Sequence, residues 1–169
     1  MLGIGNPGAG FNRTYHNVGV RAVEHIAEHE RITSFKRPGR RPFEYARSGN
    51  LIIARSLTFM NDSGRAAKAV IGYFKVLPQE FLLLHDDSDL MVGSYKLAFG
   101  QGAAGHRGVD SVVRLLGTKR FWRGRIGIRR SGDERRAESF VLSTIQPEDR
   151  EVVDRAVSEL TDAILAETV

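Results

Sequence analysis

Short apolar segments alternate along this chain with longer segments of helical periodicity, and this alternation limits the possible folds more than any other feature. We expect strands in the apolar runs at residues 1–4, 51–54, 81–84 and 123–129. Between and after these runs, apolar residues recur at the spacing of an amphipathic helix over residues 17–30, 63–74, 109–116 and 152–164. Strands that alternate with helices are typical of α/β folds with a largely parallel sheet. We therefore predict a twisted, mostly parallel sheet flanked by helices.

Length and composition favour one ordinary globular domain. The chain has 169 residues, of which 41% are apolar and 27% are charged, so residues 1–169 suit a single domain with its own core. The basic, proline-containing stretch at residues 34–42 is expected to be an exposed loop. The chain has no cysteine, which excludes disulfides, thiolate zinc sites and cysteine nucleophiles. We see no membrane-spanning run and no secretory signal, and we expect a cytoplasmic protein.

The charge balance points to an anionic partner. The formal net charge is +5. In the expected strand at residues 123–129, Arg123, Arg125 and Arg129 share one face. Charge alone does not separate a solvated basic face from one that binds nucleic acid or another polyanion.

Gly3, Gly5 and Gly8 match the G-x-G-x-x-G pattern of dinucleotide-binding loops. In such a site the helix opens on the last glycine, so that its N-terminus meets the pyrophosphate. Here residues 9–13 have the composition of a loop, and the helix is expected only near Asn17. The acidic residues that follow lie on a helical face instead of at the end of a second strand. The sequence therefore argues against a dinucleotide site.

Four polar segments are expected to meet at the carboxyl edge of the sheet, which is where open α/β sheets bind ligands. They are residues 6–17, 58–61, 85–89 and the glycine-rich stretch 100–108. His16 stands close to the expected helix N-terminus, whose positive end favours the neutral imidazole. A carboxylate such as Asp86 could fix its tautomer and make it a general base. A capping or hydrogen-bonded structural histidine is the alternative interpretation.

Two further clusters allow more than one interpretation. His85, Asp86, Asp87 and Asp89 could bind a hard cation, but aspartates in such positions also serve as turn residues. The glycines of residues 100–108 could hold a phosphate through backbone N–H groups or supply flexibility. We predict no metal site.

Six motifs follow one another in the order GIGNPG, HNVG, TFMNDSG, HDDSDL, GAAGHRG and RIGI. In this order and spacing they resemble bacterial-type peptidyl-tRNA hydrolases, from residue 3 to about residue 142. The resemblance implies a single α/β domain with a mixed sheet. It also implies an enzyme that hydrolyses the ester joining a peptide to the 3′ end of tRNA, recycling tRNA from aborted translation. Such enzymes act as monomers on peptidyl-tRNA and use no metal, cofactor or protein partner.

The resemblance assigns roles to four residues. It places the catalytic histidine at His16, its partnering aspartate at Asp86, and the two asparagines of the site at Asn6 and Asn61. His16 would then take a proton from the attacking water while Asp86 orients the imidazole. The asparagines would bind the substrate or stabilise the oxyanion. No covalent intermediate is required, and Ser63 is better explained as a helix-capping residue than as a nucleophile.

The substrate-binding positions match the family less fully. Met60 falls on a substrate-channel position, and Phe11 takes a channel position that is usually tyrosine. Arg107 replaces the usual asparagine of the glycine-rich loop, and a guanidinium cannot accept hydrogen bonds as an amide can. Ala98 stands where a lysine is frequent, so the tRNA contacts are expected to be rearranged. The expected contacts to substrate or tRNA are His106, Arg107, Lys96, Arg125, Arg135 and Arg136.

Two other functions remain open at this stage. The substitutions at Arg107 and Ala98 allow a non-catalytic RNA-binding protein on the same fold, although such a protein would have no chemical need for the catalytic set. An esterase for small acyl esters is the other alternative, and the net positive charge argues against it.

Overall fold

The computed structural model describes residues 1–166 of the chain. The strands are β1 (Leu2–Gly3), β2 (Phe43–Ser48), β3 (Leu51–Ser56), β4 (Leu82–Met91), β5 (Tyr95–Phe99) and β6 (Trp122–Arg129). The α-helices are α1 (Val18–His29), α2 (Ser63–Phe74), α3 (Arg107–Leu116) and α4 (Pro147–Ala166). Short 3-10 turns lie at Ala9–Phe11, Tyr15–Asn17, Met60–Asp62, Pro78–Glu80 and Ala137–Ser139. No helix of the described chain has the length and apolarity needed to cross a membrane.

The six strands form one sheet in the order β2-β3-β1-β4-β6-β5. The four central strands are parallel, and the outermost strands β2 and β5 pair antiparallel with β3 and β6. The prediction of a mixed, mostly parallel sheet flanked by helices is confirmed. The carboxyl ends of β1, β3 and β4 all lie at one edge of the sheet, because these strands run in the same direction.

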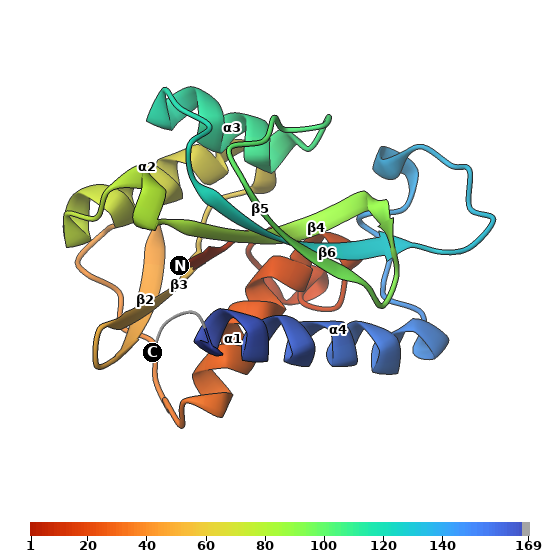
Figure 1. The fold of residues 1–169 in the computed structure, drawn as a ribbon, viewed down its shortest axis with the longest axis horizontal. Helices are drawn as coiled ribbons and strands as arrows, with labels where there is room; N and C mark the ends of the chain where they lie inside the picture. Colours follow the sequence, from red (N-terminus) through yellow and green to blue (C-terminus); the bar gives the residue numbers. More distant parts are fainter. Residues whose placement is uncertain (167–169) are drawn as a thin grey trace.

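Helices cover both faces of the sheet, as Figure 1 shows. On one face, α1 and α4 pack on a core that includes Val23, Ile26, Leu84 and Leu160. On the other face, α2 and α3 pack on a core that includes Phe81 and Phe121. Burial of these apolar side chains contributes about 25 cal/mol per Å² and is the main term that holds the two layers to the sheet.

Sequence patterns missed both edge strands and the full extent of two elements. β2 and β5 are amphipathic edge strands without a continuous apolar run, so composition did not distinguish them from loops. β4 continues to Met91 through the polar HDDSDL motif, because hydrogen bonds and ion pairs satisfy its buried charges. α4 begins at Pro147, a residue favoured in the first helical turn, five residues before its first apolar residue at 152. The stretch at residues 34–42 lies outside the helices and named strands, as expected.

Glycines bring α1 into direct contact with the sheet. A Cβ atom at Gly19 would overlap the carbonyl oxygen of Leu84, and one at Gly3 would overlap the carbonyl oxygen of Gly19. A Cβ atom at Gly5 would lie 2.9 Å from the side chain of Asn17. Two glycines of the opening motif therefore serve close backbone packing at the start of α1, where His16 is located.

Candidate active site

The polar segments predicted to converge do meet at the carboxyl edge of the sheet. They surround a cavity of about 590 Å³. Its lining includes eight of the candidate site residues, namely Asn6, His16, Met60, Asn61, Asp86, His106, Arg107 and Arg136. The other four candidates, Phe11, Lys96, Arg125 and Arg135, are not among the lining residues. The candidate residues from the sequence thus supply eight of the residues that line the cavity.

His16 and Asp86 contact each other in the arrangement expected of a base and its orienting carboxylate. His16 lies in the 3-10 turn that leads into α1, and Asp86 lies in β4. The Nδ1 atom of His16 is 2.9 Å from both carboxylate oxygens of Asp86. A carboxylate can only accept, so Nδ1 carries the proton and donates. The Nε2 atom of His16 is therefore left with the lone pair that a general base needs.

His106 is a second histidine on the same carboxylate. Its Nε2 atom is 2.8 Å from Oδ1 of Asp86. Its Nδ1 atom accepts hydrogen bonds from the backbone N–H groups of Gly108 and Val109, at 3.1 and 3.2 Å, and so caps the N-terminus of α3. These bonds assign the proton to Nε2. Sequence analysis placed His106 at the site but did not predict its bond to Asp86. It also did not predict the capping role, because histidine is an uncommon N-cap residue.

The two imidazoles determine the ionisation of Asp86. The Asp86 side chain is almost fully buried, and burial alone would raise its pKa. Hydrogen bonds and charge interactions with His106 and His16 outweigh that effect and hold the pKa of Asp86 well below its usual range. The aspartate is therefore a carboxylate that accepts from both rings. These three residues also offer ligand atoms within 4.8 Å of one another, a different set from the four-residue cluster considered in the sequence.

Asn6 is held in one orientation by two neighbouring segments. Its backbone N–H and C=O groups bond the side chain of Asn17, at 2.9 Å each. Its side-chain oxygen accepts from the backbone N–H of Met60 at 2.8 Å. That bond leaves the amino group of the Asn6 side chain as its hydrogen-bond donor at the cavity. Asn17 is a supporting residue that sequence analysis did not assign, although the HNVG motif contains it.

Cationic side chains stand at the rim of the cavity. Arg107 is the first residue of α3, and its guanidinium lies 4.0 Å from the carboxylate of Glu138. Both side chains are mostly exposed, so this ion pair contributes little to stability. Arg136 is also exposed and lines the cavity. Lys96 is exposed on β5, opposite Arg125 in the strand register.

The three arginines of β6 differ in their burial and in the groups they contact. Arg123 is buried and donates to Oε1 of Gln101 at 3.3 Å, so this position does not belong to a solvated basic face. Arg125 lies 2.5 Å from Asp87. Arg129 donates to the backbone carbonyl oxygens of Asp133 and Arg135, at 2.6 and 3.0 Å. The Arg129 guanidinium thereby holds the loop after β6 in place.

His85 is a buried histidine next to the site. Its Nδ1 atom is 2.6 Å from the carbonyl oxygen of Asp86, and its ring lies edge-on to His106 with centroids 4.9 Å apart. Burial lowers the pKa of His85 to about 3. His85 is therefore neutral in the folded protein at ordinary pH.

This burial gives a testable dependence of stability on pH. Between about pH 6.5 and the folded value of about 3, His85 binds a proton only in the unfolded chain. The free energy of unfolding should therefore decrease as the pH falls from 7 to 5, and by less in His85→Asn. Urea unfolding at both pH values measures the difference. Equal decreases in the free energy of unfolding for the wild type and His85→Asn would contradict the assignment of His85 as a buried neutral histidine. Asp86 does not interfere, because a carboxylate with a depressed pKa loses its contribution only below about pH 4.

Comparison with known proteins identifies the family. The family model described as peptidyl-tRNA hydrolase matches residues 1–168. The chain belongs to the peptidyl-tRNA hydrolase family. It is 36% identical to the peptidyl-tRNA hydrolase of Acidiphilium cryptum over 168 residues, which is 96% of this chain and 85% of the relative. It is also 36% identical to that of Mycobacterium tuberculosis over 166 residues, covering 96% of this chain and 87% of the relative.

A solved structure of the family has the same fold. The crystal structure of the peptidyl-tRNA hydrolase from Acinetobacter baumannii superimposes with a TM-score of 0.84 at 26% sequence identity, covering 98% of this chain and 89% of the other. The six motifs of the peptidyl-tRNA hydrolase resemblance now have places in the fold. GIGNPG spans the end of β1 and the loop after it, HNVG opens α1, and TFMNDSG opens α2. HDDSDL extends along β4, GAAGHRG leads into α3, and RIGI lies in β6.

Proposed function

We propose that this protein hydrolyses the ester bond between the peptide and the tRNA of peptidyl-tRNA, with His16 as the general base. The observation that carries the proposal is the bond of Asp86 to Nδ1 of His16, which leaves Nε2 to accept a proton from water. Family membership supports peptidyl-tRNA as the substrate. General-base catalysis of this kind typically contributes about 10²–10⁴-fold in rate.

The two cavity asparagines are proposed to bind the substrate carbonyl or the developing oxyanion. The amino group of the Asn6 side chain is the available donor, since its oxygen is bonded to Met60. Asn61 lines the same cavity. A donor that is held in place before the reaction stabilises the oxyanion without reorganisation, and loss of one such donor can cost about 10²–10³-fold in rate. The proposed chemistry requires no metal or cofactor.

Multiple-turnover hydrolysis of N-acetylaminoacyl-tRNA, with EDTA present, tests the proposal. Release of many product molecules per enzyme molecule would support a metal-independent hydrolase. Binding of tRNA without turnover, in a folded protein, would favour the non-catalytic RNA-binding alternative that the Arg107 and Ala98 substitutions allow. Equal turnover of a small acyl ester would indicate a general esterase.

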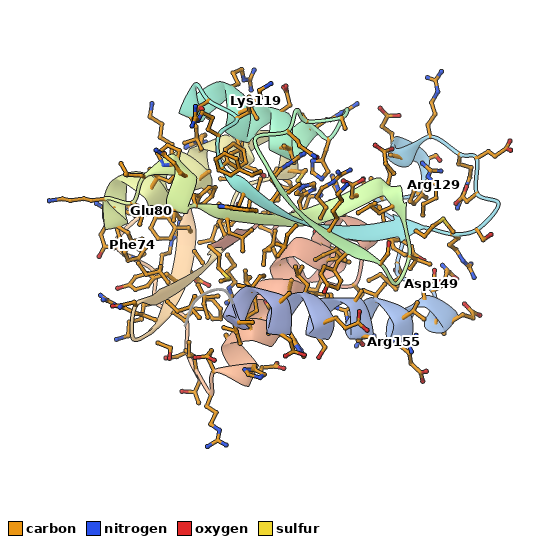
Figure 2. The ribbon with its side chains drawn as sticks, viewed as in Figure 1. Phe74, Glu80, Lys119, Arg129, Asp149 and Arg155 are labelled. Carbon is orange, nitrogen blue, oxygen red and sulfur yellow. The ribbon has the colours of Figure 1, made fainter. Side chains whose placement is uncertain are left out.

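Two exposed cations, Lys96 on β5 and Arg136 at the cavity, are proposed to bind phosphates of the tRNA, and the salt dependence of affinity tests this role. Each phosphate contact contributes about 0.7–0.9 to the slope of log affinity against log salt. Lys96→Gln and Arg136→Gln should each reduce that slope by about this amount. Arg155→Gln, an exposed arginine of α4 (Figure 2), is the control and should leave the slope unchanged. Unchanged slopes in all three variants would exclude these two contacts.

A further inference from the structure

One wall of the cavity comes from the segment that joins β6 to α4. Ala137, Glu138, Val141 and Leu142 of this segment line the cavity. Apart from a single 3-10 turn, the segment contains no helix or strand of its own. Its position must therefore be set by contacts with other parts of the protein.

Those contacts are made with the residues around His16. The backbone N–H of His16 donates to the carbonyl oxygen of Val141 at 2.8 Å. The N–H of Tyr15 donates to Ser143 at 3.2 Å, and the N–H of Ile145 donates to Arg13 at 2.8 Å. The imidazole and the cavity wall are therefore positioned by the same short ladder of backbone bonds.

A cluster of three side chains, the buried Tyr15 and Asp149 and the exposed Arg130, lies at the far end of this ladder. The Tyr15 hydroxyl donates to Oδ2 of Asp149 and accepts from the backbone N–H of Gln146 at 3.3 Å. Asp149 lies in the first turn of α4, and the Nε atom of Arg130 is 3.3 Å from the same Oδ2. Both Tyr15 and Asp149 are buried. Burial and the bond to Asp149 raise the pKa of Tyr15 to about 12, so the hydroxyl keeps its proton.

The cluster connects parts of the chain that are distant in the sequence. Arg130 directly follows β6, and Asp149 lies three residues into the described range of α4, so they stand at the two ends of the wall segment. Asp149 and Arg129, the neighbour of Arg130, lie at the same end of the molecule in Figure 2. Tyr15 directly precedes His16 in the sequence. The cluster thus joins both ends of the wall segment to the residue before the catalytic histidine.

We propose that Tyr15, Asp149 and Arg130 form a clamp that positions His16 relative to the cavity wall. The inference rests on the proposed function, because it takes His16 as the base. Tyr15 and Asp149 are positioning residues in this proposal, since the cavity lining includes Asp86 and His16 but not Tyr15 or Asp149.

Kinetics of Tyr15→Phe test the clamp. The substitution keeps the ring, which packs edge-on against Phe140, and removes only the hydroxyl. We expect kcat for N-acetylaminoacyl-tRNA to fall about tenfold with KM nearly unchanged, which is less than the ~10²-fold that a misplacement of 1 Å can cost. Asp149→Ala should give a similar loss. The double variant should lose no more than the more affected single variant, because both substitutions break one unit.

Three controls separate positioning from stability and from the proposed function. Tyr45→Phe removes the hydroxyl of another partly buried tyrosine and should leave kcat unchanged. Kinetics are measured well below the melting temperature of each variant. Asp149→Asn keeps an acceptor for the Tyr15 hydroxyl and should retain most of the kcat that Asp149→Ala loses. Wild-type kcat in Tyr15→Phe, with His16→Asn inactive, would overturn the clamp alone. Inactivity of the wild-type protein would instead overturn the proposed function.

Discussion

His16→Asn should lower kcat for N-acetylaminoacyl-tRNA by about 10²–10⁴-fold, the usual contribution of a positioned general base. The asparagine side chain can still donate to Asp86, but it has no basic nitrogen to accept a proton from water. KM should change little, because the asparagines and the cations at the rim are untouched. A single-turnover measurement, with enzyme in saturating excess over substrate, isolates the chemical step.

His29→Asn is the matched control for this experiment. His29 is an exposed histidine in the last turn of α1, the same helix that His16 precedes. The control should retain wild-type kcat, while circular dichroism and thermal unfolding show that both variants are folded. A folded His16→Asn protein with kcat within threefold of the wild type would rule out His16 as the base.

Asp86→Asn should lower kcat by a comparable factor, about 10²–10⁴-fold. An asparagine offers one oxygen to the two imidazole N–H groups that now share the carboxylate. Its amino group would favour the His16 tautomer with the proton on Nε2, which cannot act as a base; the equivalent change in a serine-protease triad costs about 10⁴-fold. The burial of Asp86 prevents water from replacing the lost acceptor.

The pH dependence of stability gives Asp86→Asn a second readout. Because the folded pKa of Asp86 is depressed, its charge stabilises the fold above the unfolded value of about 4 and loses that contribution as the pH falls through the folded value. The variant should therefore be less stable than the wild type at pH 7, and the gap should narrow in acid. Asp89→Asn, an exposed neighbour on β4, should show neither effect. Full activity in a folded Asp86→Asn protein would contradict the orienting role.

The fold class followed from the sequence because alternation of apolar runs and helical periodicity is a local signal. The cavity also followed, since parallel strands deliver their following loops to one edge. The bond between His106 and Asp86 was not foreseeable, because it depends on the approach of α3 to β4 from a distant part of the chain. The burial of Arg123 and the Tyr15–Asp149 contact were missed for the same reason, as each involves residues that are distant in the sequence.

The close packing of Gly3 and Gly19 has a consequence for how the protein can vary during evolution. Where two backbones touch, there is no side chain whose change could be compensated by a second substitution nearby, so this contact cannot drift in the way an apolar core drifts. Substitutions during evolution should therefore accumulate elsewhere, while this backbone contact between α1 and the sheet, here called the seam, stays fixed. Because His16 stands at the start of that helix, the seam preserves the direction in which the imidazole faces Asp86 while the rest of the molecule changes.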